Sequence, residues 1–370
     1  SYPVVHEDAE KRFEADHPNV DVKREYISYT EYLVKLKAVL SGEEAPDVFQ
    51  IPWAGEYTEL ARSGKLLPLT APLKTGFPMF FDNVMKAIAV DGDAWAVPLD
   101  LNTLQIAYNK TMFDKMGLKV PTTKDEFIAL AAKLKEQGKF GVAIGTKDLW
   151  AGADVFFAQV SYSDPTHTKM AMADAKKIPW TSPEFVKAIE VADELVKKGV
   201  FAPGANSMDA FVGAKNLFVQ QQAAMFYPVG NFVTGGLTAD IGDSFEWSLF
   251  PFPPHAAGSE PLPTGGVAEM FVVSKGSKNT ETALDFLRYM TDDKGKEILV
   301  KNDFIPSSSY KGSAAISALY KNMLDAQSKA QSRVVYNTEV YSAVMNGMQG
   351  IFGQTLTPKA FIDSLVSVSK

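Results

Sequence analysis

The sequence predicts an α/β fold organised as two lobes. Its length of 370 residues exceeds what a single hydrophobic core usually serves, so two domains of ordinary size are expected. Short apolar runs typical of buried strands alternate with amphipathic helical patterns along the chain. Apolar residues make up 46% of the chain, which excludes a disordered protein.

The N-terminal part of the chain is expected to alternate helices with strands. Val5, Ala9 and Phe13 share one face of a predicted helix that ends before Pro18. The elements expected next are a strand at 20–26, a helix over 30–40, a turn at 42–46 and a buried strand at 47–51. That last strand ends at 52–55, a position where α/β sheets commonly bind ligands.

Residues 99–108 form a predicted strand that carries many polar side chains. Asp100, Asn102, Thr103 and Gln105 are interspersed here with apolar and β-branched residues. Buried polar groups must satisfy their hydrogen bonds, and a cleft that holds a polar ligand would do so. We therefore interpret this segment as a hinge strand between the two lobes.

A helix-start signal follows the hinge strand. Thr122 and Thr123 followed by Glu126 resemble a capping box, and apolar residues then recur at helical spacing from Phe127 to Leu134. The further elements expected are a strand at 141–145, a helix at 151–160, a helix starting at 182–184, strands at 223–228 and 269–273, and helices at 314–328 and 358–368.

Two later crossings between the lobes are expected. One follows the Pro-rich stretch 250–254 and precedes the strand at 269–273, and the other lies at Ile305–Pro306. Together with the hinge strand they predict a discontinuous architecture. The expected first lobe comprises residues 1–103 and 264–303, and the expected second lobe comprises residues 104–263 and 304–370.

Ordered short stretches across the chain carry a family resemblance. The longest is VPLDLNTLQIAYNKTMFDKMGLKVPTTKDEF at 97–127, and the others lie at 18–22, 45–49, 61–69, 271–277 and 283–287. Together they resemble family 1 of the extracellular solute-binding proteins of ABC importers, which is maltose-binding-protein-like and binds sugars. The resemblance implies a two-lobed periplasmic-binding-protein-like fold with about three crossover segments and a ligand cleft between the lobes. It also implies a first strand ahead of Ser1.

Tryptophans and hinge-strand polar residues are the first candidate ligand contacts. Trp53 and Trp150 each follow a short predicted strand, and an aromatic face can pack on the C–H face of a sugar. The alternative for any tryptophan is a place in the core. Asp100 and Asn102 can accept from and donate to vicinal hydroxyls, and their alternative is a hydrogen-bonded hinge network.

The resemblance implies further contacts in three later segments. Tyr227, Asn231 and Phe232 resemble a turn that lines the cleft of relatives. The pair Gly265–Gly266 resembles a turn where the backbone approaches the ligand, with a plain turn as the alternative. Arg333 and Tyr336 occupy the approximate place of a late loop over the cleft; an inward Arg333 would favour an anionic group, whereas a surface or interlobe ion pair is the usual outcome.

Composition excludes several other classes of protein. The chain has no cysteine, which removes disulfides and thiolate chemistry, and its net charge of −7 argues against nucleic acid as a partner. No apolar run approaches the roughly 20 residues of a membrane span. The four histidines lack metal-ligand spacing, and no P-loop, dinucleotide fingerprint or nucleophile elbow occurs, so we expect no metal and no cofactor.

These observations lead to one expected function and two alternatives. We expect a substrate-binding component of an ABC transporter that captures a carbohydrate or related polyol by hinge closure and delivers it to the permease subunits. An anionic sugar derivative, polyol phosphate or polyamine on the same fold is one alternative. The other is a secreted carbohydrate-active hydrolase with the same aromatic and carboxylate content. The resemblance implies a monomer in the periplasm, or an extracellular lipoprotein anchored to the membrane.

Overall fold

The structure is a computed structural model whose contacts divide the chain into two compact units. It describes residues 2–27, 29–40, 45–52, 55–166, 168–255, 259–260, 262–332 and 337–369. Unit 1 comprises Ser1–Asn102 and Val267–Tyr320, and unit 2 comprises Thr103–Gly266 and Lys321–Lys370. Both units contain helices and strands, so the predicted α/β class is confirmed.

Each of the three connections between the units runs inside a regular element. These elements are the strands β5 (Asp100–Asn109) and β9 (Thr264–Val267) and the helix α14 (Ala318–Gln327). The third connection lies further along the chain than the expected boundary at 303–304. It does so because Ile305 and Pro306 pair with Leu101 and Asp100 at the start of β5, which keeps them in unit 1.

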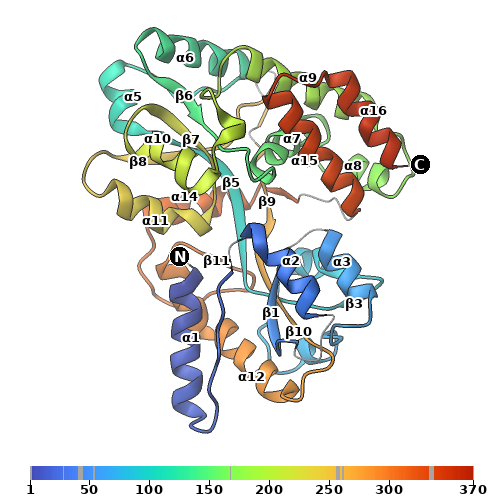
Figure 1. The fold of residues 1–370 in the computed structure, drawn as a ribbon. Coiled ribbons are helices and arrows are strands. Elements are labelled where there is room, and N and C mark those ends of the chain that lie inside the picture. Colours follow the sequence, from blue (N-terminus) through green and yellow to red (C-terminus); the bar gives the residue numbers. More distant parts are fainter. Residues whose placement is uncertain are drawn as a thin grey trace. The chain divides into compact units, whose positions relative to one another are not determined.

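Unit 1 is built on a small sheet with the order β1-β10-β4, in which both pairings are antiparallel. Its elements outside the connections are α1 (Tyr2–Asp16), α2 (Tyr29–Val39), β1 (Val48–Pro52), α3 (Gly55–Arg62), η1 (Pro72–Lys74), α4 (Asp82–Ala87), β2 (Ala89–Val90), β3 (Asp93–Ala94), β4 (Val97–Pro98), β10 (Glu269–Val273), α12 (Thr280–Thr291), α13 (Asp293–Lys301) and β11 (Ile305–Pro306). The predicted face of α1 is confirmed, because Val5, Ala9 and Phe13 are buried. Helix α1 lies beside α12 (Figure 1).

The strand expected at 20–26 is absent. These residues form no regular structure and are mostly exposed, although they run back along α1. Side chains rather than a sheet hold them there: Arg24 pairs with Glu10 at 2.7 Å, and Val22 N donates to Glu14 at 2.9 Å. The prediction was wrong because the alternation of valines with charged residues gave no information about a neighbouring strand.

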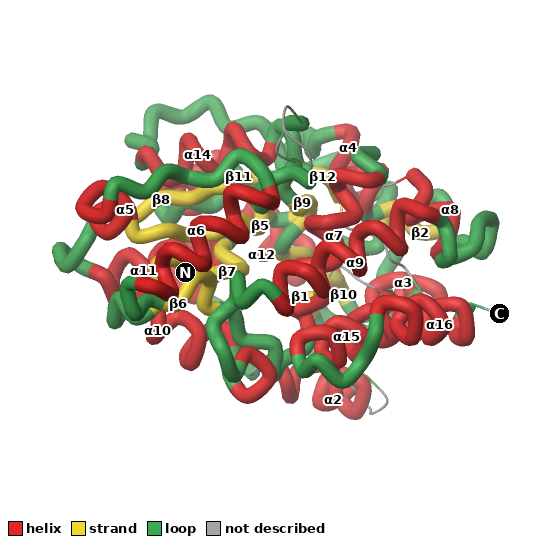
Figure 2. Tube along the Cα trace, turned by 90° about the horizontal axis from the view of Figure 1, so that it is seen from above, coloured by secondary structure: helices red, strands yellow, loops and turns green. Residues whose placement is uncertain are grey.

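Unit 2 is the larger unit and has a mixed sheet. Its elements outside the connections are α5 (Lys110–Met116), α6 (Lys124–Glu136), β6 (Phe140–Ala143), α7 (Trp150–Ser163), α8 (Thr168–Asp174), α9 (Pro183–Lys197), η2 (Ala205–Ser207), η3 (Ala210–Ala214), α10 (Lys215–Val219), β7 (Ala223–Val229), α11 (Asn231–Ile241), β8 (Trp247–Phe250), β12 (Gln331–Ser332), α15 (Thr338–Phe352) and α16 (Pro358–Val368). The sheet has the order β12-β9-β5-β7-β6, and β8 also pairs with β5. Figure 2 shows α6 and α10 beside its strands.

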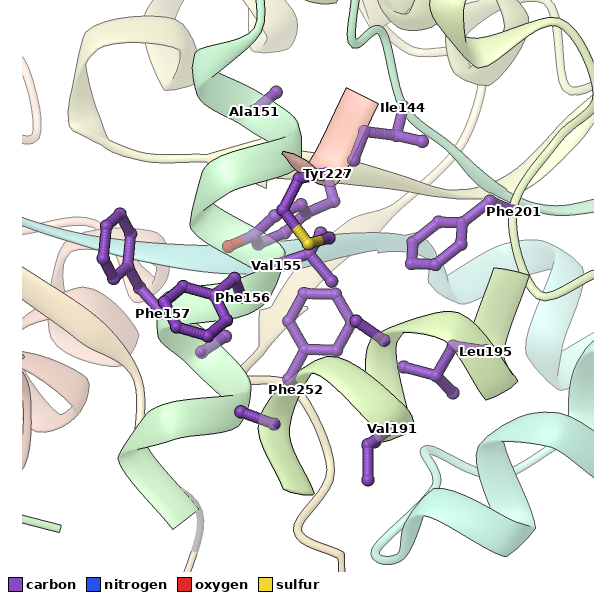
Figure 3. Packing of buried hydrophobic residues seen from close by; sticks show 14 of the residues in the cluster. Ile144, Ala151, Val155, Phe156, Phe157, Val191, Leu195, Phe201, Tyr227 and Phe252 are labelled. Atoms are coloured by element: carbon purple, nitrogen blue, oxygen red, sulfur yellow. The ribbon is translucent and has the colours of Figure 1, made fainter. Parts of the chain in front are cut away.

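The core of unit 2 lies where α7 packs against α9, α15 and the sheet. Helix α7 is buried along most of its length, and its buried residues include Asp154, Gln159 and Ser161 besides the apolar majority. Figure 3 shows Phe156, Val191, Leu195 and Phe252 meeting in this core. A large rigid core of this kind can hold surface side chains in fixed positions.

The predicted capping box opens α6. The Thr123 hydroxyl accepts from Glu126 N at 3.2 Å, and the Glu126 carboxylate accepts from Thr122 N at 2.7 Å and from the Thr122 hydroxyl at 2.8 Å. The backbone and hydroxyl of Thr122 lower the pKa of Glu126. The helix therefore begins where the sequence predicts, and the carboxylate reaches the residue before the cap.

Candidate functional site

Three aromatic side chains of unit 2 form a partly exposed cluster, which we call the aromatic platform. It consists of Trp150 at the start of α7, Phe211 in η3 and Phe232 at the start of α11. Trp150 and Phe211 are stacked, with ring centroids 5.6 Å apart and planes at 26°. Phe232 stands edge-on to both rings, at 6.2 Å from Trp150 and 5.9 Å from Phe211.

The chain enters α7 through a strained turn that directs Trp150. Leu149 has φ 66° and ψ −46°, and Trp150 N donates to Asp148 O at 2.8 Å, which is the hydrogen bond of a γ-turn. A branched residue in this region costs about 1–3 kcal/mol, and such outliers concentrate at functional sites. The sequence prediction that Trp150 follows a short strand is consistent with its place after β6.

Phe211 was not among the predicted contacts. It lies in a five-residue π-helical turn, η3, in which Ala214 N donates to Asp209 O at 3.1 Å. Turns of this type are rare and occur often at functional sites. Phe211 is 38% exposed, so it is the most open ring of the platform. Sequence periodicity cannot reveal a π-turn; the one available signal was an aromatic residue two positions after a capping Asp209.

The three contacts predicted around the start of α11, Tyr227, Asn231 and Phe232, lie in different environments. Phe232 joins the aromatic platform, whereas Asn231 is 1% exposed and accepts from the Thr234 hydroxyl through its backbone carbonyl at 2.9 Å. Tyr227 has no exposed surface, and its ring meets that of Phe252 at 4.7 Å inside the core. Figure 3 shows Tyr227 among the core side chains. Of these three residues, Phe232 makes an aromatic contact with Trp150.

Asp100 lies in a buried hydrogen-bond network. It is fully buried in unit 1, its carboxylate accepts from Glu269 N at 3.1 Å, and its backbone carbonyl accepts from Ala268 N at 2.9 Å. The Glu269 carboxylate is itself buried and lies 3.0 Å from His6 Nε2. Asp100 therefore contributes to the internal order of unit 1, and its carboxylate is already engaged.

Asn102 differs from the other polar residues of β5. Gln105 Nε2 donates to the Thr103 hydroxyl at 3.1 Å, and Asn109 caps α5 by accepting from Met112 N at 2.7 Å. Asn102 is 5% exposed, and its Oδ1 atom has no hydrogen-bond partner among the described residues. A buried amide oxygen without a partner costs free energy, so it is a natural acceptor for a ligand hydroxyl.

The paired glycines belong to strand β9, so the turn expected at this position is absent. Gly265 is buried, and Gly266 has φ 138°, a conformation that favours glycine. Thr264 at the start of the strand is 1% exposed, and its hydroxyl has no hydrogen-bond partner within the described part of the chain. Sequence reasoning did not single out Thr264.

Three predicted contacts lie outside the described residues. These are Trp53, Arg333 and Tyr336. The described segments contain no group of three or more histidine, aspartate or glutamate side chains arranged to hold a metal ion. In the same segments, no helix has the length and apolar character required to cross a membrane.

Comparison with known proteins shows the family of the chain. A family model described as bacterial extracellular solute-binding protein matches residues 2–297. The multiple sugar-binding protein of Streptococcus mutans is 26% identical over 288 residues, which cover 76% of this chain and 66% of that protein. The melibiose/raffinose/stachyose-binding protein MelE of Bacillus subtilis is 22% identical over 308 residues, with coverages of 80% and 68%. The matches thus span about two thirds of the length of these relatives.

A solved structure shows the same fold. It comes from work on xylan utilization by Caldanaerobius polysaccharolyticus and aligns with a TM-score of 0.88 at 21% identity, covering 99% of this chain and 96% of that chain. This likeness confirms the predicted two-lobed solute-binding fold. Because the family match extends over well more than half of the sequence, the chain belongs to the family of bacterial extracellular solute-binding proteins.

Proposed function

We propose that this protein is the substrate-binding component of an ABC importer and that it captures a neutral carbohydrate. Family membership and the sugar-binding relatives support the transport role and the class of solute. The observation that carries the proposal is the aromatic platform, in which Phe211 is 38% exposed and is backed by Trp150. An open aromatic face matches the apolar C–H face of a pyranose ring.

A polar group of unit 1 is a second, separate candidate contact. Asn102 of unit 1 offers a buried acceptor, Oδ1, that the described residues leave without a partner. A sugar presents hydroxyl donors beside its C–H faces, so it can use an aromatic surface and an amide at the same time. Buried acceptors also give specificity, because a solute that lacks the matching hydroxyl leaves the amide unpaired.

The proposed mechanism is hinge closure without covalent chemistry. The solute would stabilise the closed state through its higher affinity for that state over the open one. The three connections within β5, β9 and α14 are the segments where the backbone would bend. Closure would create the surface that the permease subunits recognise. The site of action would be the periplasm or the outer face of the membrane, with the protein as a monomer.

A thermal-shift screen tests the proposed function. The panel contains xylotriose, raffinose, maltotriose, diacetylchitobiose, monosaccharides, polyols and sugar phosphates. A ligand that binds only the folded state raises the apparent melting temperature by mass action. We expect at least one neutral oligosaccharide to stabilise the protein, and the Trp150→Ala variant to lose that shift. Stabilisation by sugar phosphates alone would contradict the neutral class.

The same samples distinguish binding from hydrolysis. After incubation of the protein with the stabilising sugar, chromatography should recover the sugar intact, and repeated titrations should give the same heat. Release of smaller sugars at a rate proportional to protein concentration would instead identify a hydrolase. This control is required because binding and hydrolysis of glycans use the same kinds of side chain, aromatic rings and carboxylates.

A further inference from the structure

We propose that Asp209 and Gly145 form a positioning device that fixes the aromatic platform and thereby sets affinity for the solute. The inference deepens the proposed function and rests on it, because the platform is the proposed binding surface. Neither residue is required to touch the solute. Their role follows from how the turn between β6 and α7 joins the segment that carries Phe211.

The backbone of that turn packs directly on the segment 205–209. Thr146 N donates to Ala205 O at 2.9 Å, and Lys147 N donates to Met208 O at 3.0 Å. At Gly145 the two backbones are closer than any side chain allows: a Cβ atom there would lie 2.3 Å from both Asp209 C and Asp209 O. Gly145 therefore lets the two backbones meet, and any larger residue must push Asp209 away.

Asp209 holds the turn η3, which contains Phe211, through two hydrogen bonds. Its Oδ1 accepts from Val212 N at 2.6 Å, and its backbone carbonyl accepts from Ala214 N at 3.1 Å. One residue thus caps η3 and closes its π-type hydrogen bond. Because Phe211 lies inside this turn, the direction of its ring depends on both contacts of Asp209.

The tryptophan side of the platform starts from the same turn. Residues 145–149 lead from β6 into α7, and the γ-turn at Leu149 ends at Trp150. Gly145 and Asp209 are in close backbone contact. Trp150 follows the segment that contains Gly145, and Phe211 follows Asp209, so both stacked rings are attached near this one contact. Fixing the two rings before the solute arrives removes part of the ordering cost of binding, which raises affinity without a new contact.

The first test compares Asp209→Ala with Asp209→Asn. The alanine removes the cap on Val212 N, whereas the asparagine keeps an acceptor oxygen in the same place. Affinity is measured by calorimetry with the sugar of the panel that gives the largest thermal shift. We expect Asp209→Ala to weaken binding about tenfold and Asp209→Asn to stay within about twofold of the unmodified protein. Equal losses in both variants would assign Asp209 a role through its charge and would overturn the proposal.

A second readout follows the platform without any ligand. The protein is labelled with 5-fluorotryptophan, and the fluorine resonance of Trp150 is identified by its absence in Trp150→Phe. Phe211→Ala then shows where that resonance lies when the stacked ring is gone. We expect Asp209→Ala to move the resonance toward this position and Asp209→Asn to leave it in place. A resonance that stays unchanged in Asp209→Ala would contradict the positioning role.

Glycine variants provide a matched structural control. Gly141→Ala introduces a backbone clash at the same shortest distance, 2.3 Å from Val200 O, within β6 and not against the segment that carries Phe211. Gly145→Ala should shift the Trp150 resonance and Gly141→Ala should not; equal behaviour of the two would contradict the proposal. If Gly145→Ala does not fold, the Asp209 pair decides the question. If no panel sugar binds the unmodified protein, the proposed function fails, while the fluorine spectra still test the positioning device.

Discussion

The ring of Phe211 stacks on the ring of Trp150, with centroids 5.6 Å apart and an interplanar angle of 26°. Stacking covers one face of each ring, so a solute can use only the outer faces. Phe211 is the more exposed partner, and Trp150 covers one face of its ring. The proposed solute contact in unit 2 is therefore centred on Phe211, with the predicted Trp150 as its support.

Asn102→Ala should weaken solute binding about tenfold or more, because it removes Oδ1, the atom that is proposed to accept a hydrogen bond from a solute hydroxyl. The free energy of unfolding should change by less than about 1 kcal/mol, since Oδ1 of Asn102 makes no hydrogen bond within the described residues. Calorimetric titration and urea denaturation measure the two quantities.

The matched control is Asn109→Ala, another buried asparagine on β5. Asn109 caps α5, so its loss should lower the free energy of unfolding by about 1 kcal/mol and leave affinity unchanged. Unchanged binding in Asn102→Ala would remove Asn102 from the proposed site.

Tyr227→Phe should leave solute affinity within about twofold of the unmodified protein, because Tyr227 is fully buried in the core of unit 2. Tyr227→Ala should lower the free energy of unfolding by about 3–5 kcal/mol, the usual cost of deleting a large core ring. Titration and denaturation curves check both expectations. A large loss of affinity in the folded Tyr227→Phe variant would show that the hydroxyl serves the solute after all.

Stability should fall between pH 6.5 and about pH 4 through His255. Burial, with added repulsion from Lys187 and Lys124, lowers the pKa of His255 to about 4. The folded state thus binds its proton less readily than the unfolded state, so the contribution of neutral His255 is present above pH 6.5 and is lost as the pH falls toward 4. Because the ring is partly exposed, we expect a loss of about 1–2 kcal/mol.

Thermal unfolding at several pH values measures this effect. His255→Gln is the comparison, because glutamine can still contact Gln159, whose Oε1 lies 2.8 Å from His255 Nε2. The melting temperature of the variant should fall less steeply over this pH range. Parallel curves for the two proteins would show that other groups cause the acid sensitivity.

Local sequence signals predicted much of the fold. The apolar spacing of Val5, Ala9 and Phe13 gave α1, and the capping box at Thr123 and Glu126 gave the start of α6, because both patterns act within one or two helical turns. The strand expected at 20–26 depended on a distant partner, and no local pattern specifies that partner.

The candidate site was harder to predict than the fold. Trp150 was proposed from its place after a predicted strand, and Phe232 and Tyr227 from the resemblance; the structure brings Trp150 and Phe232 together, whereas Tyr227 is in the core. The polar pattern of β5 did not show which side chains satisfy one another, and only the structure separates Asn102 from Gln105. Phe211 was missed because it lies in a π-helical turn, and the apolar spacings used to predict α-helices and strands do not identify such a turn.

The most direct test of a carbohydrate site on the aromatic platform is calorimetric titration of the matched pair Phe211→Ala and Phe140→Ala. The two phenylalanines belong to unit 2 and are 38% and 39% exposed, so the truncations remove similar surface. With the sugar that stabilises the unmodified protein, Phe211→Ala should bind about tenfold more weakly or worse, and Phe140→Ala should bind normally. Equal affinities for the two variants would contradict the central role of the platform.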